Sequence, residues 1–201
     1  MKQLLGLTIL LFSFLTANAQ TAIGLKYGVQ NTDLFDYSDA SSVSASNYGL
    51  ILNFGYSHVV SFQMEVNYSP KGSVYDFLGD ETEEVYNYLE VPLLLKLSFG
   101  ANSLKYYGIV GAFAAVPESI KTISGNQESK GGGLSGEDGF DDLDLGIQLG
   151  AGLTYDLGPG RILGEVRYST GFEGLPDEFT DAKALLFSVG YLFTFGKKIK
   201  D

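Results

Sequence analysis

"NYLEVPLLLKLSF", residues 87–99, alternates two kinds of side chain with a period of two. Every odd position over 89–97 is apolar, whereas the even positions include Glu90, Pro92 and Lys96. Successive side chains of a β-strand point to opposite faces of the sheet. The stretch therefore predicts a strand with one unbroken apolar face and one face that carries charge and a proline.

The same alternation recurs in the rest of the chain after its first residues, where almost nothing has a helical period. Most of these runs span 9 to 14 residues, whereas strands of soluble proteins average about five or six. A tilted strand that crosses a bilayer needs about 9–11 residues, and it is apolar toward lipid and polar toward the barrel interior. The eight runs are roughly 21–30, 46–57, 61–72, 85–98, 103–115, 141–156, 161–170 and 183–196.

The gaps between these runs alternate in length. The long gaps are 31–45, 73–84, 116–140 and 171–182, and the short ones are 58–60, 99–102 and 157–160. Outer-membrane barrels have short periplasmic turns and longer external loops. We therefore predict an all-β fold, an eight-stranded antiparallel transmembrane up-and-down β-barrel of the size of OmpA and OmpX, closed by pairing of 21–30 with 183–196.

Tyrosine and phenylalanine are frequent near the ends of the runs, which is typical of the aromatic girdles at membrane interfaces. Aromatic residues also favour strands of any kind, so this signal supports the barrel without deciding it. The aromatic residues in question are Tyr48, Tyr56, Tyr68, Tyr86, Tyr88, Phe99, Tyr106, Tyr107, Tyr155, Tyr168, Tyr191, Phe193 and Phe195.

The first residues predict an export signal. Lys2 is followed by an apolar run over 4–15 and by the small-x-small pattern of 17–19. We expect a signal peptide over 1–19 and a barrel domain over 20–201. The formal net charge of -11 argues against a nucleic-acid partner, because phosphate backbones repel an acidic chain.

Charges on the polar parity are expected to lie inside the barrel. Side chains fill the interior of an eight-stranded barrel, so buried charges there must be paired. We expect an internal network of ion pairs in which Glu90 and Lys96 each have a partner of opposite charge, and a local bulge that accommodates Pro92. The lumen candidates are Lys26, Glu65, Lys71, Glu90, Lys96, Asp144, Glu165 and Arg167.

No motif predicts catalysis or a cofactor. The single histidine, His58, lies in a short turn near serines, and we interpret it as a turn residue. The acidic stretch over 135–146 lacks the spacing of a calcium loop, and we interpret it as a solvated loop leading into a strand. We therefore assign no catalytic, cofactor-binding or metal-binding residue.

Several segments carry a family resemblance. They are "YLEVPLLLK" (88–96), "YYGIVGAF" (106–113), "LGIQLGAGLTYDL" (145–157), "GEVRYSTGF" (164–172) and "SVGYLFTFG" (188–196). Together they resemble the PorT-like outer-membrane β-barrel family of Gram-negative bacteria, and the first is the specific part. The resemblance implies a barrel of about eight strands in the cell outer membrane, and it supplies no catalytic residues.

The leading functional hypothesis is a non-enzymatic barrel with a structural, adhesion or assembly role through its extracellular loops. Expected partners are outer-membrane lipid and lipopolysaccharide, the barrel-assembly machinery, and an unknown protein or extracellular partner that contacts the loop over 116–140. A small transporter or pore is the alternative, because glycines on the polar parity could leave water-filled space. A soluble calyx for a lipophile is a second alternative, in which the apolar parity would face inward.

Overall fold

The computed structural model describes residues 20–33, 41–55, 57, 59–77, 80–100, 103–124, 127–131, 143–172 and 183–195. The expected signal peptide lies outside these described residues. No helix in them is long and apolar enough to cross a membrane. The strands are β1 (Gln20–Asp33), β2 (Ser41–Gly55), β3 (Val60–Phe77), β4 (Asp80–Phe99), β5 (Leu104–Ser124), β6 (Gln127–Gly131), β7 (Asp144–Leu157), β8 (Gly160–Gly171) and β9 (Lys183–Phe195).

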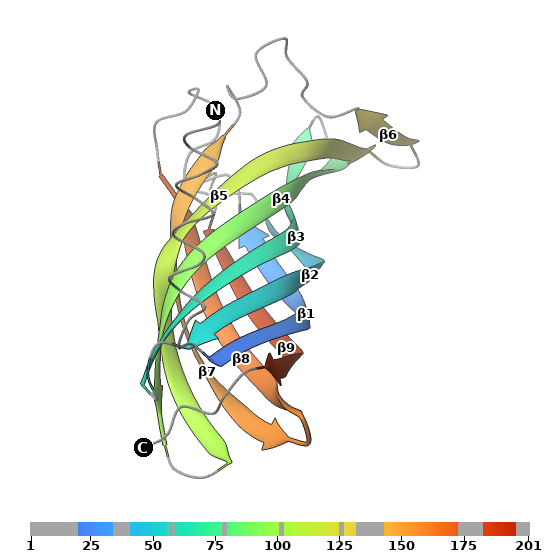
Figure 1. Cartoon of the computed structure of the whole chain (residues 1–201). Helices are drawn as coiled ribbons and strands as arrows, with labels where there is room; N and C mark the ends of the chain where they lie inside the picture. The colour runs from blue at the N-terminus through green and yellow to red at the C-terminus, as the bar shows by residue number, and fades with distance from the viewer. Residues whose placement is uncertain are drawn as a thin grey trace, which may run out of the picture.

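Eight of these strands close into one antiparallel barrel (Figure 1). The order around the wall is β4-β3-β2-β1-β9-β8-β7-β5. Because β4 also pairs with β5, every strand of the ring has two neighbours. β1 pairs with β9 from Thr21 opposite Phe195 to Asp33 opposite Lys183. The predicted fold and its closure by the first and last strands are therefore confirmed. The short β6 pairs with the far end of β5, outside the ring.

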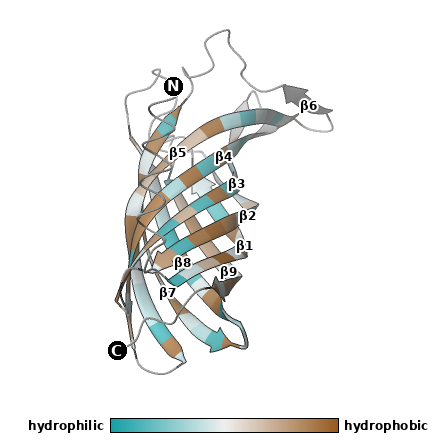
Figure 2. Ribbon diagram, in the orientation of Figure 1, coloured by the Kyte–Doolittle hydropathy of each residue, from teal (hydrophilic) through white to brown (hydrophobic). Residues whose placement is uncertain are grey.

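Alternation along each strand separates the two faces of the wall. Leu93 is 60% exposed on the outside, whereas Leu94 is 2% exposed on the inside. Figure 2 shows apolar and hydrophilic residues alternating along the strands. The buried set contains charged and amide side chains from most of the strands, such as Lys26, Glu65 and Gln148. The apolar parity thus faces outward, and the calyx hypothesis, which required it to face inward, is wrong.

Exposed aromatic side chains occupy two levels on the outer wall. One level lies near the short turns and includes Phe62, Phe99, Tyr106, Tyr155 and Phe193. The other lies nearer the opposite end and includes Tyr27, Tyr48, Tyr168 and Phe187. Two levels separated by an apolar band are the pattern of membrane girdles.

Two tyrosines of the expected girdles lie inside the barrel instead. Tyr88 and Tyr107 are each 3% exposed, because they share the parity of the lumen residues on β4 and β5. Position near a strand end was therefore not a sufficient criterion for a girdle residue, and parity decides between the two environments.

The two ends of the barrel differ in their connections. One end has the three expected short turns, after β2, β4 and β7. At the other end the expected long gaps are partly strand, because β3 and β4 continue to Phe77 and from Asp80, and β5 continues to Ser124. Main-chain pairing can extend beyond the apolar band because ladder hydrogen bonds do not require apolar side chains. Figure 1 shows β4 and β5 extending past the other strands, with β6 beside them.

Pro92 does not lie in a bulge, contrary to prediction. β3 and β4 keep one register on both sides of it, with Met64 opposite Leu93 and Asn67 opposite Glu90. Proline has no amide hydrogen to donate, and the β3–β4 pairing is interrupted between Leu93 and Glu90. The proline ring is buried in the lumen. The irregularity of β4 lies instead between Asn87 and Tyr88, where it pairs with β5.

Candidate functional site: the polar network in the lumen

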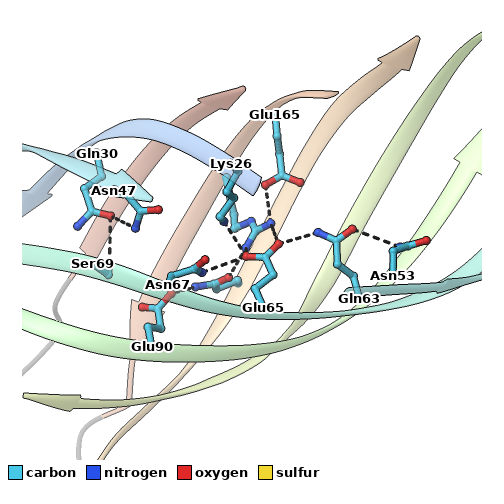
Figure 3. A network of polar contacts seen from close by, with 12 residues as sticks. Lys26, Gln30, Asn47, Asn53, Gln63, Glu65, Asn67, Ser69, Glu90 and Glu165 are labelled. Atoms are coloured by element: carbon cyan, nitrogen blue, oxygen red, sulfur yellow. Dashed lines mark hydrogen bonds and ion pairs between the residues drawn. The ribbon is translucent and has the colours of Figure 1, made fainter. Parts of the chain in front are cut away.

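Glu65 on β3 is the centre of a buried polar network inside the barrel (Figure 3). Its side chain is fully buried and accepts a hydrogen bond of 2.6 Å from Lys26 Nζ on β1. Gln63 Nε2 donates to Glu65 Oε1 at 2.6 Å, and Asn67 Nδ2 donates to Oε2 at 3.0 Å. Residues 63, 65 and 67 share the inner face of β3 because they differ by two. The strand itself therefore provides two of the donors.

Arg167 on β8 holds the same carboxylate from the opposite wall. Its Nη1 and Nη2 donate to Glu65 Oε2 and Oε1 at 3.0 and 2.9 Å, so the pair is bidentate. β8 and β3 are four positions apart in the ring of eight strands, so this pair spans the lumen. Nη2 also donates to Glu165 Oε1 at 2.5 Å, which places Arg167 between two carboxylates.

Glu90 on β4 forms a second branch. Lys71 Nζ on β3 lies 3.4 Å from its Oε2, and Gln148 Nε2 on β7 donates to its Oε1 at 2.8 Å. Gln148 Oε1 accepts from Arg167 Nη1 at 2.9 Å. Gln148 therefore connects this branch to the central Glu65–Arg167 pair.

Lys96 departs from the expected ion pairing. Among the described residues, no carboxylate lies within ion-pair distance of it. Its Nζ lies 3.5 Å from the centroid of the Tyr107 ring, and the Tyr107 hydroxyl donates to Glu165 Oε2 at 2.9 Å. The cation thus joins the network through an aromatic face, which attracts cations by its quadrupole. The prediction of a carboxylate partner is wrong for Lys96, whereas Glu90 has Lys71.

Asp144 lies at the margin of the network. It is half-buried at the start of β7, opposite Ala115 of β5, which in turn lies opposite Glu90. Among the described residues, ion pairs join at least six of the eight charged candidates, Lys96 contacts a tyrosine ring, and Asp144 lies in the register row of Glu90. The six are Lys26, Glu65, Lys71, Glu90, Glu165 and Arg167.

An amide cluster that was not singled out from the sequence extends the network along β1, β2 and β3. Gln30 Oε1 accepts hydrogen bonds from Asn47 Nδ2 at 3.0 Å and from Ser69 Oγ at 3.1 Å. Gln30 Nε2 donates to the carbonyl oxygen of Pro70. The signal was present, because all three side chains stand on the lumen parity of their strands. The lumen candidates were chosen from the sequence by their charge, so these neutral side chains were not among them.

Apolar side chains enclose the network along the barrel axis. Toward the short turns lies a cluster of Ala22, Ile51, Leu163 and Leu192, each close to the end of its strand. On the other side of Glu90, Lys71 Nζ lies 5.0 Å from the Tyr88 ring centroid and 4.7 Å from that of Phe113. Tyr88 and Phe113 pack together with Ala115.

Lumen glycines make room for these rings. A Cβ placed at Gly152 would lie 2.6 Å from the Tyr107 hydroxyl oxygen, and one at Gly146 would lie 2.4 Å from the Phe113 ring. These two glycines therefore leave space that neighbouring side chains occupy. They do not support the water-filled space on which the pore hypothesis depended.

This arrangement connects the strands of the barrel wall to one another by hydrogen bonds and ion pairs. Side-chain hydrogen bonds join β1, β3, β4, β5, β7 and β8 across the interior, and each of the three carboxylates has at least two partners. Within the described ranges, no three side chains of the metal-ligating types are grouped to hold an ion. His58 and the acidic positions 137–142 lie outside the described residues.

Comparison with known proteins identifies the family. Residues 16–175 match the family described as "Outer membrane protein beta-barrel domain". The chain belongs to this family. Its location is accordingly the outer membrane, as predicted, and the exposed apolar band of this outer-membrane barrel faces lipid. No curated protein sequence matches the chain.

Solved structures of outer-membrane barrels have the same fold. Ail, the attachment invasion locus protein of Yersinia pestis, is 13% identical with a TM-score of 0.51, covering 89% of this chain and 99% of Ail. Neisserial surface protein A is 12% identical with a TM-score of 0.54, covering 87% and 97%. OprG from Pseudomonas aeruginosa is 13% identical with a TM-score of 0.50, covering 90% and 98%. At these identities the likeness concerns the fold alone.

Proposed function

We propose that this outer-membrane barrel is a non-enzymatic scaffold that binds a partner through the hairpins at its long-strand end, in an adhesion or assembly role. Within the family we place it among the PorT-like barrels, on the segment "YLEVPLLLK" over 88–96. The proposal includes export by a signal peptide over 1–19 and insertion by the barrel-assembly machinery. The proposal also assigns the lumen network a structural role in the barrel.

The observation that carries the proposal is the Glu65–Arg167 pair across the lumen. Both side chains are at most 1% exposed, and apolar clusters lie on both sides of the network. A pore needs a continuous aqueous path, and the wide channels of porins have 16 or more strands. With the lumen occupied by side chains, the surface for a partner lies outside the membrane.

The strands at the long-strand end provide such a surface. β4 and β5 have 20 and 21 residues, whereas crossing the bilayer requires about 9–11. Each strand therefore has roughly ten residues in excess, or about 30 Å of extended chain at ~3.3 Å per residue. Among the described residues β6 pairs with β5 alone, so its other edge offers main-chain donors and acceptors to a partner strand. We place this end on the cell exterior, because long connections of outer-membrane barrels lie there.

Replacing 125–140, which includes β6, with a Gly/Ser linker should abolish partner capture. The last residue of β5 that pairs with β7 is Ala115, and β5 continues from there to Ser124, a span of about 30 Å. The linker must cover that distance back to β7, which requires about ten residues. We expect at least about tenfold less crosslinked partner from whole cells, since 1.4 kcal/mol of lost contact suffices for that factor. Folding, seen as heat-modifiable gel migration, should be unchanged.

The matched control places a linker of the same composition at 173–182, between β8 and β9. This variant should keep its partner at the level of the unmodified protein. Partner capture that survives the 125–140 replacement would contradict the proposed role of this segment. So would crosslinks that map only to the short turns.

A further inference from the structure

β6 has one main-chain edge to which no described strand pairs, because β5 occupies only its other edge (Figure 1). The edge of a sheet presents amide and carbonyl groups to which a further strand can pair. The sequence of β6 is "QESKG" over 127–131, so Glu128 and Lys130 stand on either side of Ser129. Charge and symmetry in these five residues indicate which strand fits the edge.

The ladder between β5 and β6 places no opposite charge directly across from either charged position of β6. Glu128 lies opposite Ile123, and Lys130 lies opposite Lys121. Opposite charges directly across a strand pair stabilise the pairing, whereas like charges destabilise it. The free edge therefore favours a strand with a base opposite Glu128 and an acid opposite Lys130.

A second copy of β6 is such a strand. When two copies pair antiparallel about Ser129, Glu128 of each copy lies opposite Lys130 of the other. The same short strand thus supplies both charged pairs of the interface. This self-complementarity is what a two-fold symmetric contact between identical chains requires.

Symmetry also selects the register. Neighbouring residue pairs of an antiparallel ladder alternate between two kinds, so a two-fold pairing of identical strands must be centred on a residue. A centre at Glu128 or at Lys130 would place two like charges directly opposite each other. Of the three inner positions of β6, Ser129 is the one whose register makes both charged pairs attractive.

We propose, on the basis of the function proposed for the hairpins, that the partner strand of β6 is β6 of a second copy of this chain, paired antiparallel about Ser129. The Ser129 side chain is exposed, and hydroxyl side chains that face each other across a strand pair can hydrogen-bond. The second copy lies in the same membrane or in an apposed one, since either arrangement offers the same edge.

Ser129→Cys tests the pairing, because the chain has no cysteine of its own. Residues directly opposite each other in an antiparallel pair have Cα atoms about 4.5–5.5 Å apart, which a disulfide can span. Protein in phospholipid vesicles, shown to be folded by heat-modifiable migration, should give a disulfide-linked dimer under mild oxidation.

Thr122→Cys is the matched control, because Thr122 lies opposite Ser129 on β5. In the proposed dimer the two copies of this position are three strand spacings apart, about 14 Å, which is too far for a disulfide. We expect at least about tenfold less dimer than from Ser129→Cys. Equal amounts of dimer from the two cysteine variants would show random collision and would overturn the inference.

Exchange of charge gives a second readout, with each variant made in the Ser129→Cys background. Glu128→Lys makes both charged pairs of the dimer basic, and Lys130→Glu makes both acidic. Each variant alone should give at least about tenfold less dimer. A mixture of the two should restore dimer between the variants, because each acid again faces a base. A mixture that gives no more dimer than either variant alone would contradict the proposed register.

Two tags on the Ser129→Cys protein locate the second copy. Dimer between tags in co-reconstituted vesicles alone places both copies in one membrane, and dimer after separately loaded vesicles are mixed places them in apposed membranes. No dimer between tags in either arrangement would overturn the self-pairing. If 125–140 still captures a different protein from whole cells in that case, the function proposed for the hairpins stands. If the 125–140 replacement leaves capture unchanged, that function fails by itself.

Discussion

Glu65→Ala is expected to lower the free energy of unfolding of the barrel by about 3–5 kcal/mol, the usual cost of removing one partner of a buried ion pair. The carboxylate binds Lys26 and both terminal nitrogens of Arg167. Without it, Lys26 loses its carboxylate partner in the interior, and Arg167 is left with Glu165 and Gln148 among the described residues. Urea unfolding in lipid vesicles, followed by circular dichroism and by the folded gel band, measures the change.

Lys96→Met is the matched comparison for this experiment. Lys96 is also a buried lumen charge, but it contacts an aromatic ring and no carboxylate among the described residues. Its removal leaves no opposite charge unpaired, so we expect a change within about 1 kcal/mol, because the lost cation–π attraction is offset by removing a buried charge. Equal effects of the two substitutions would show that Glu65 is not the centre of the network.

Leu93→Arg is expected to destabilise the inserted barrel by about 2–4 kcal/mol, the cost of a cation at the bilayer midplane. Leu93 is 60% exposed on the outer wall, in the middle of the apolar face of β4. The expected result is a loss of the folded, heat-modifiable band after refolding into vesicles. Folding yield against urea concentration measures the size of the effect.

Leu93→Phe is the control, because it changes the size of the same side chain without adding charge. It should fold as the unmodified protein does, since aromatic residues are common on the lipid face. If the arginine variant inserts as well as the phenylalanine variant, Leu93 does not face hydrocarbon, and the outward assignment of the odd positions on β4 is wrong.

The barrel was predictable from the sequence because two physical constraints act on every strand. Each crossing segment must be long enough for the bilayer and must alternate apolar and polar side chains, as 87–99 does. The extensions of β3, β4 and β5 were not predictable in the same way. The sequence over 73–84 has no regular apolar alternation, so it did not predict the main-chain pairing of β3 with β4 there.

The charged members of the network were also predictable, because charge on the lumen parity of a narrow barrel must be compensated. Which residue meets which depends on distances across the barrel, and strand parity contains no such information. Lys96 and Tyr107 illustrate this limit. Tyr107 was assigned to a girdle, yet it turns inward and takes the position beside Lys96 that a carboxylate was expected to occupy.

Ion conductance in a planar bilayer tests the central claim most directly. That claim is that side chains close the lumen and leave recognition to the hairpins outside the membrane. Reconstituted protein, verified as folded by heat-modifiable migration, should give no steady current above that of the bare bilayer. Reproducible single-channel steps from the unmodified protein would contradict the account, because they require an aqueous path past the Glu65–Arg167 pair.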